Sequence, residues 1–94
     1  MPTESALRAR ETAGVTSYSF TAYFEFRVLA KRLYLRKEWC IYVVENAVRS
    51  EPQERNRFRF WAPIEGLEGR YLRVITLEDK VTIHNAFPDR EFSP

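Results

Sequence analysis

The stretch 57-RFRFWAPIEGLEGRYLRVITLEDKVTIHNAFPDREF-92 carries most of the information about the fold, because its apolar residues recur with a period of two. Three segments alternate in this way, and each is rich in β-branched or aromatic residues. These segments are residues 57–62, 71–77 and 81–87. A glycine-bearing loop and a Glu-Asp-Lys turn separate them. The pattern predicts three or four antiparallel strands, the last of them ended by Pro88.

The residues before this stretch indicate two helices. The second, residues 36–48 (RKEWCIYVVENAV), has apolar residues at the spacing i, i+3, i+4 and i+7. Its cysteine, Cys40, falls on the apolar stripe, so we expect a buried small side chain and not a reactive thiol. The first helix is expected from Tyr23 onward, capped by Ser19 or Thr21. A strand is the alternative there, because the residues YSFTAYFEF also alternate.

These elements predict an α+β fold in which two N-terminal helices precede a three- to four-stranded antiparallel sheet. One sheet face is expected to pack on the helices, and the other to face water. The chain has 94 residues, so we expect one domain, spanning 18–94. Residues 1–17 are polar and are predicted to form a flexible N-terminal segment.

Composition excludes several classes of protein and site. No apolar run approaches the 18 residues of a membrane span, so we expect no membrane partner. One cysteine and one histidine fall short of the four ligands of a structural zinc site, and no phosphate-binding loop motif occurs. We therefore expect no metal and no cofactor. The single cysteine and the absence of an apolar leader favour the cytoplasm.

Basic residues are concentrated although the net charge is only +2. Residues 27–37 hold five basic residues and no acid, and residues 55–59 hold three arginines and no acid. Such clusters attract polyanions. We therefore expect nucleic-acid contacts from Arg27, Lys31, Arg32, Arg57 and Arg90. The alternative is a solvated helix face and a charged hairpin.

A candidate catalytic group follows from the alternation of side chains on the last two strands. A two-residue turn at 78–79 or 79–80 would place Arg73 and His84 on the same outer face, as direct or diagonal cross-strand neighbours. Arg59 would join them from the preceding strand. Histidine can transfer a proton near neutral pH, and arginine can stabilise charge on a phosphate. This set would suit metal-free RNA cleavage by an adjacent 2′-hydroxyl, although all three residues could equally be solvated polar groups.

The chain also resembles a known group of proteins. The segments KRLYLRKEWC, RFRFW, YLRVITLED and TIHNAFPDR, within residues 18–92, are similar to small bacterial and cyanobacterial toxin-like domains near the RelE and BrnT ribonuclease toxins. The resemblance implies a RelE-like α+β domain whose exposed sheet surface cleaves RNA and is covered by an antitoxin protein. It also implies strand-borne phosphate contacts at Arg59 and Arg73, and an acid or base at His84.

Two other functions remain open at this point. The basic residues 27–37 could hold nucleic acid or an acidic partner without any catalysis. Alternatively, the chain could form a homodimer or bind a protein partner, with Trp61 and Tyr71 as exposed interface anchors.

Overall fold

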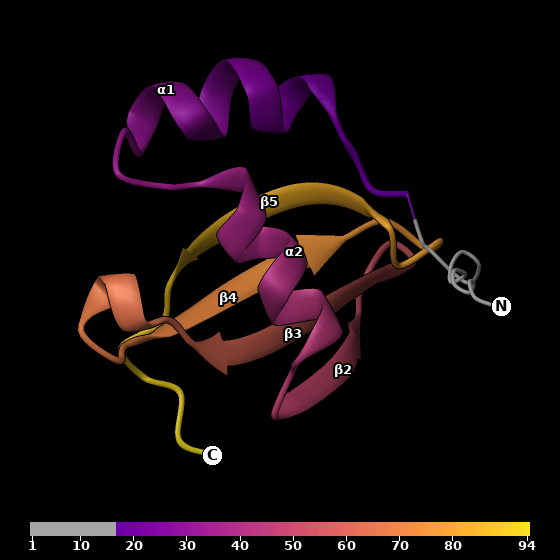
Figure 1. Cartoon of the computed structure of the whole chain (residues 1–94). Coiled ribbons are helices and arrows are strands. Elements are labelled where there is room, and N and C mark those ends of the chain that lie inside the picture. The colour runs from indigo at the N-terminus through magenta and orange to yellow at the C-terminus, as the bar shows by residue number, and fades with distance from the viewer. Residues whose placement is uncertain (1–16) are drawn as a thin grey trace, which may run out of the picture.

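The computed structural model describes residues 17–94, which form an α+β domain (Figure 1). The elements in chain order are β1 (Ser19–Phe20), the consecutive helical segments η1 (Phe24–Val28) and α1 (Leu29–Lys31), α2 (Lys37–Glu45), β2 (Arg49–Gln53), β3 (Arg57–Pro63), the short helix η2 (Glu65–Leu67), β4 (Tyr71–Thr76) and β5 (Thr82–Pro88). The predicted α+β class with two helices is confirmed. The flexible segment predicted over residues 1–17 lies outside the described residues, except for Ser17.

The sheet has five strands in the order β1-β5-β4-β3-β2. β1 pairs with β5 in parallel, and the other neighbours are antiparallel. The expectation of three or four purely antiparallel strands was therefore wrong. It missed β1 because only two residues pair there. It missed most of β2 because this strand is polar and contains Pro52, which reads as a turn and is tolerated only at a sheet edge.

The first helix begins where the sequence predicted. The Oγ1 atom of Thr21 accepts a hydrogen bond from the Phe24 N–H at 3.1 Å, so Thr21 is the cap and Ser19 belongs to a strand. The strand and helix alternatives for residues 18–26 are both realised in part, because the chain changes from one to the other at Thr21. The helix adopts π geometry over η1 and ordinary α geometry over α1.

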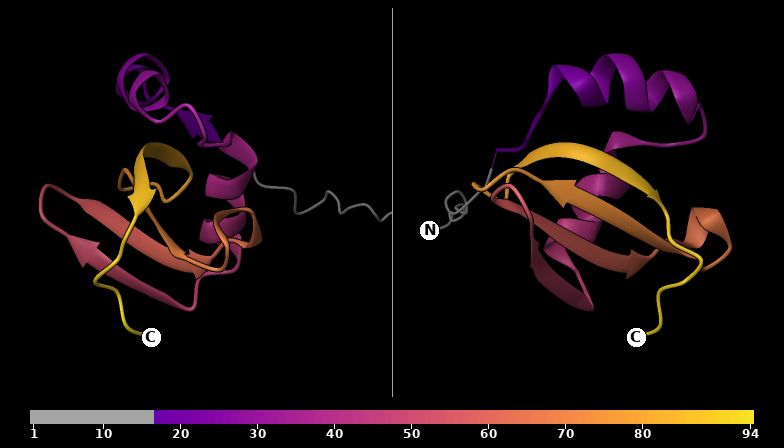
Figure 2. Two further views of the ribbon diagram at one scale, coloured as in Figure 1. Left: turned by 90° about the vertical axis from the view of Figure 1, so that its left-hand side faces the viewer. Right: turned by 180° about the vertical axis from the view of Figure 1, so that it is seen from behind.

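The hydrophobic core lies between the helices and one face of the sheet. α2 crosses β3 and β4 on this face, and the first helix lies along β5 (Figures 1 and 2). The fully buried residues include Phe24, Val28, Cys40, Val43, Leu72, Val74, Ile83 and Ala86. The predicted burial of Cys40 is confirmed, and burial raises the pKa of its thiol to about 12. Within residues 17–94, no helix is long and apolar enough to cross a membrane.

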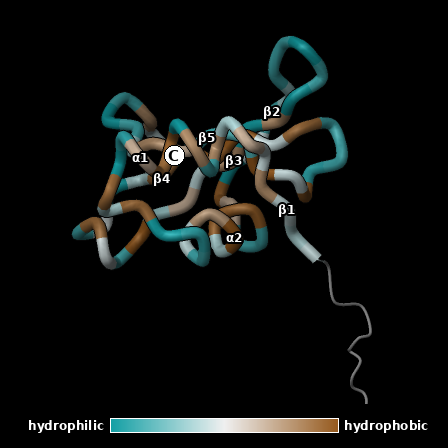
Figure 3. Tube along the Cα trace, turned by 90° about the horizontal axis from the view of Figure 1, so that it is seen from above, coloured by the Kyte–Doolittle hydropathy of each residue, from teal (hydrophilic) through white to brown (hydrophobic). Residues whose placement is uncertain are grey.

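The other face of the sheet, which we call the open face, carries a different set of side chains. The C-terminal segment, residues 89–94, runs over it on the side opposite α2 (Figure 2, left). Hydrophilic and hydrophobic residues both occur around α2, and the turn beyond β2 is hydrophilic (Figure 3). The open face was expected to face water, yet Trp61 is only 4% exposed there. Trp61 is therefore not the exposed interface anchor that the sequence suggested.

A β-bulge changes the register that was expected between β4 and β5. Arg73 pairs with Phe87, and Thr76 pairs with Ile83. The register shifts between Ile75 and Thr76, and His84 is left without a partner in β4. The prediction that Arg73 and His84 are direct or diagonal cross-strand neighbours was therefore wrong, because a bulge reverses the alternation on which it depended.

Candidate functional site

Four cross-strand neighbours form a row across the open face. Arg49 in β2 pairs with Trp61 in β3, Trp61 pairs with Arg73 in β4, and Arg73 pairs with Phe87 in β5. We call these four residues the arginine–aromatic row. Neighbouring strands lie about 4.8 Å apart, so each cation is adjacent to a ring. The order of residues along the row is therefore cation, ring, cation, ring.

The spacing of the groups supports cation–π contact along the row. The Arg73 guanidinium carbon lies 5.3 Å from the centre of the Trp61 ring and 5.1 Å from that of Phe87. Arg59 lies two residues before Trp61 on the same face of β3, and its guanidinium carbon is 5.6 Å from the centre of the Trp61 ring. Arg32, at the end of α1, lies 5.8 Å from Phe87 and extends the row beyond the sheet. These contacts fall within the range of about 6 Å in which rings attract cations.

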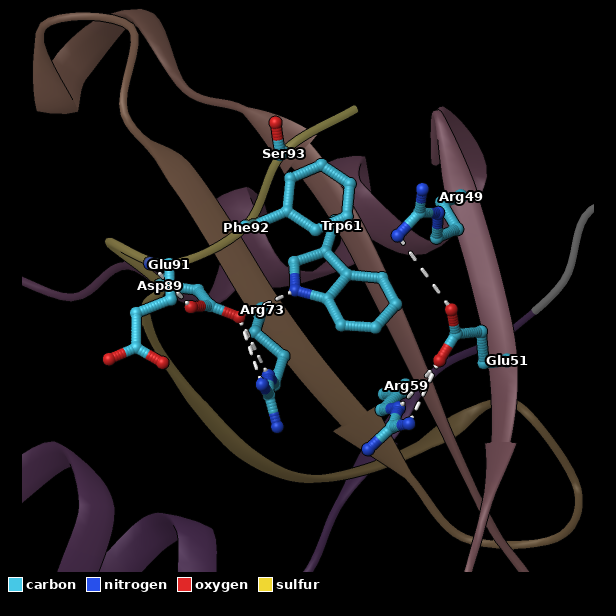
Figure 4. Close-up of a pocket in the computed structure, with 9 residues that line it drawn as sticks. All are labelled: Arg49, Glu51, Arg59, Trp61, Arg73, Asp89, Glu91, Phe92 and Ser93. Carbon is cyan, nitrogen blue, oxygen red and sulfur yellow. Dashed lines mark hydrogen bonds and ion pairs between the residues drawn. The ribbon is translucent and has the colours of Figure 1, made fainter.

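Carboxylates hold two of the arginines in place (Figure 4). Glu51 Oε1 accepts hydrogen bonds from Arg59 Nε at 3.2 Å and Nη2 at 2.8 Å. Asp89 Oδ2 accepts them from Arg73 Nε at 3.1 Å and Nη2 at 2.9 Å, and also from Trp61 Nε1 at 2.9 Å. A guanidinium has five N–H donors, so these bonds leave three donors on each arginine with no partner among the described residues.

Asp89 is the anchor of this network. Its side chain is 9% exposed, so burial by itself raises the pKa of the carboxyl. Hydrogen bonds from Trp61 and Arg73, with that from the Glu91 N–H, outweigh burial and hold the pKa below its usual value. Asp89 is therefore a charged structural partner near neutral pH.

A cavity of about 370 Å³ lies at the β2 side of the row. It is lined by Arg49, Glu51, Arg59, Trp61, Arg73, Asp89, Glu91, Phe92 and Ser93 (Figure 4). Its three arginines and three acids give no formal net charge. The lining of the cavity therefore has no excess of positive charge. Carboxylates direct the guanidinium donors of Arg59 and Arg73, and two aromatic rings, those of Trp61 and Phe92, belong to the wall.

His84 lies outside this cavity. Its Nδ1 is 3.0 Å from Thr21 Oγ1, and its ring stacks on Tyr23 with ring centres 4.8 Å apart. Burial, with a smaller effect of the Arg57 charge, lowers the pKa of His84 from 6.5. Phe87, the residue of β5 in the row, is three residues along the chain from His84, or about 10 Å in a regular strand.

The structure thus brings together only part of the predicted site. Arg59 and Arg73 line one cavity, whereas His84 sits at the bulge beside the start of the first helix. Of the expected nucleic-acid contacts, Arg32 contacts the row and Arg57 lies near His84. The remaining three are exposed at separate places, with Arg27 and Lys31 on the first helix and Arg90 in the C-terminal segment.

Sequence reasoning missed six of the nine residues that line the cavity: Arg49, Glu51, Asp89, Glu91, Phe92 and Ser93. The alternation Arg49-Ser50-Glu51 could have indicated β2, since Glu51 pairs directly with Arg59. Asp89 is adjacent to Arg90 in the chain, but its carboxylate pairs with Arg73. Nothing in the local sequence of Phe92 indicates that it returns to Trp61.

Residues 17–94 contain no group of three or more His, Cys, Asp or Glu side chains placed to hold a metal ion. Comparison of the chain with protein-family models, curated proteins and solved structures gives no significant match.

Proposed function

We propose that this protein binds single-stranded RNA on its open face, along the arginine–aromatic row. The row itself is the observation that supports the proposal. Single-stranded nucleic acid is bound by arginines that contact phosphates and by rings that stack on bases. Here the two kinds of group alternate across four adjacent strands.

The ion pairs are compatible with phosphate binding. Glu51 and Asp89 each contact one edge of a guanidinium and leave three N–H donors for another acceptor. Holding an arginine in one orientation also lowers the entropy cost of ordering it when a ligand binds. The carboxylates reduce the attraction between the cavity and phosphate, so we expect modest affinity that falls steeply with salt.

Salt dependence measures the number of phosphates bound. Each phosphate contact on a single strand contributes about −0.7 to the slope of log K against log salt, so contacts from Arg49, Arg59 and Arg73 predict a slope of about −2. The measurement is fluorescence anisotropy of a labelled single-stranded RNA of twelve nucleotides between 25 and 200 mM salt. A slope near zero, or no binding at the lowest salt, would contradict the proposal.

Arg49→Ala is the informative variant. The Arg49 side chain is 45% exposed, and its ion pair with Glu51 is long at 3.8 Å, so the fold should tolerate the change. We expect the slope to become less negative by about 0.7. Arg36→Ala is the matched control. Arg36 is 63% exposed and precedes α2, on the other face of the sheet, so its removal should leave the slope unchanged.

A second candidate function is metal-independent cleavage of the bound RNA, as in an endoribonuclease toxin held inactive by an antitoxin. Glu91 favours it, because this exposed carboxylate lines the same cavity as Arg59 and Arg73. A carboxylate beside guanidinium groups could accept the proton of a 2′-hydroxyl while the arginines stabilise charge on the phosphate.

Two substitutions distinguish the catalytic hypotheses. Cleavage lost in His84→Ala but not in Glu91→Gln would assign the proton transfer to His84, as the sequence suggested. The opposite result would assign it to Glu91. Induced expression of each variant in a bacterial host, with growth and total RNA followed, gives the readout. If expression of the wild-type chain leaves RNA intact and growth normal, and the protein binds RNA in vitro, the binding function is supported and cleavage is ruled out.

A further inference from the structure

Phe92 occupies a site made of groups that bind flat rings. Its ring is stacked on Trp61, with centres 4.8 Å apart and planes 17° from parallel. Tyr71 closes one side at 4.9 Å, and the Arg49 guanidinium carbon lies 5.0 Å from the centre of the Phe92 ring. Figure 4 shows the Phe92 ring in front of the Trp61 indole, with Arg49 to one side. We call Trp61, Tyr71 and Arg49 the ring site.

The ring site contains hydrogen-bond donors that a phenyl ring cannot pair with. The Arg49 guanidinium, with its N–H donors, lies over the Phe92 ring at 5.0 Å from the ring centre, and its contact with Glu51 is long at 3.8 Å. Phenylalanine has no acceptor for these donors, whereas a nucleobase has both a flat face and acceptors along its edge. A base stacked on Trp61 could therefore use both the ring and the guanidinium.

The attachment of the C-terminal segment allows Phe92 to leave without disturbing the sheet. Asp89 is firmly held, since its N–H donates to the Tyr71 carbonyl at 2.9 Å and its carboxylate accepts bonds from β3 and β4. Beyond Asp89 the bonds are local: the Glu91 N–H donates to Asp89 Oδ1, and the Phe92 N–H reaches the Asp89 carbonyl only at 3.4 Å. Ring contacts are thus the main attachment of Phe92.

We propose that Phe92 is an internal placeholder for a nucleobase, and that a base of bound RNA displaces it from the ring site. The inference rests on the proposed RNA-binding function and assigns one base-stacking subsite within it. Asp89 stays bound to Trp61 and Arg73 in both states and acts as the hinge. Residues 92–94 swing away from the sheet when the base enters, while the Glu91 N–H keeps its hydrogen bond to Asp89 Oδ1.

The test is to measure the affinity for RNA after the Phe92 ring, which competes with the base, has been removed. The apparent dissociation constant of the wild-type chain equals the intrinsic constant divided by the fraction of molecules in which Phe92 has left the site. Phe92→Ala should therefore bind the twelve-nucleotide RNA about 3- to 10-fold more tightly. Deletion of residues 92–94 should do the same. Phe26→Ala is the control, because Phe26 is an exposed ring on the first helix, away from the site, and should leave affinity unchanged.

A second measurement follows the ring itself. Adenosine monophosphate titrated into Phe92→Ala should quench the Trp61 fluorescence, and this quenching should be absent in Phe92→Ala with Trp61→Phe. In the wild-type chain, the NMR signals of the Phe92 ring should move toward those of a solvent-exposed phenylalanine when RNA is added. This readout needs no substitution at Phe92, so it remains informative if the Phe92 variants fail to fold.

The outcomes separate the two proposals. If wild type binds RNA and folded Phe92→Ala binds equally or less tightly, the placeholder is wrong and the binding function stands. Unchanged Phe92 ring signals in RNA-bound wild type would overturn the placeholder in the same way. If neither protein binds RNA, both proposals are wrong.

Discussion

Substitution of Asp89 by asparagine should lower the free energy of unfolding by about 1–2 kcal/mol. The amide oxygen keeps an acceptor near Trp61 and Arg73 but removes the charge. A hydrogen bond to a charged group contributes about 1.5–3 kcal/mol, and a neutral one about 0.5–1.5 kcal/mol. The bond from Trp61 becomes a neutral one and should lose about 1 kcal/mol, and the lost ion pair with Arg73 should cost about 1 kcal/mol more. Arg73 is 26% exposed, so solvent screening reduces the total to about 1–2 kcal/mol.

The pH dependence of this loss follows from the lowered pKa of Asp89. A carboxyl whose folded pKa is depressed contributes stability above its unfolded pKa, here near 3.8, and loses it as the pH falls through the folded value. The free energy of unfolding of wild type should therefore exceed that of Asp89→Asn by a constant amount above about pH 5. The difference should shrink as the pH falls below 3.8.

Urea denaturation followed by far-ultraviolet circular dichroism at pH 7, 5 and 3 measures the effect. Glu91→Gln is the matched control, because it removes the same charge from an exposed side chain two residues away and should change stability by less than about 0.5 kcal/mol. Equal losses for the two variants at pH 7, or a loss from Asp89→Asn that does not depend on pH, would refute the argument.

Three further outcomes are expected. Cys40, with a pKa of about 12, should not react with a thiol reagent at pH 8 until denaturant is added, and reaction of the native protein would contradict its burial. Gly66→Ala should lower the melting temperature by the equivalent of about 1–3 kcal/mol, because the new Cβ would lie 2.5 Å from Trp39 Cζ2, and an unchanged melting temperature would show that the indole moves freely. His84 should titrate below pH 6.5 by NMR. Since its folded pKa is lowered, its contribution to stability is complete above 6.5 and is lost as the pH falls below that value, so a midpoint at or above 6.5 would contradict its burial.

Much of the fold was predictable because strong periodic patterns determined it. The alternation in residues 57–62 and 71–76 correctly separated the core-facing side chains, such as Phe60 and Val74, from Arg59 and Arg73 on the other face. The stripe around Cys40 predicted α2 for the same reason, since burial of one helix face leaves a regular spacing.

The register of β5 was not predictable from alternation alone. Leu77 N–H donates to the Thr82 carbonyl and Thr76 pairs with Ile83, so the register beside the turn is one of the two that were expected, and the bulge further along the strand changes it. Ile83 and Ala86 are both buried in the same core although they are three positions apart, an odd spacing that puts side chains on opposite faces of a regular strand. The bulge at His84 resolves this conflict, and the i, i+3 spacing of apolar residues was the available signal.

The candidate site was harder to predict than the fold because its contacts join distant parts of the chain. Asp89 and Phe92 reach Trp61 across about thirty residues, and neither belongs to a periodic segment. Polar and aromatic partners of this kind follow from the sheet order, and β2 and β1 had to be known before that order could be derived.

The two outermost strands also affect how copies of this protein can meet. β1 is only two residues long, and β2 carries Pro52 between Glu51 and Gln53 with Arg49 nearby. Short edges, proline and charged residues all oppose the addition of a further strand from another molecule. Both outermost strands thus have features that oppose edge-to-edge aggregation. If the protein dimerises, we expect the contact to involve a face of the domain and not a continuous intermolecular sheet.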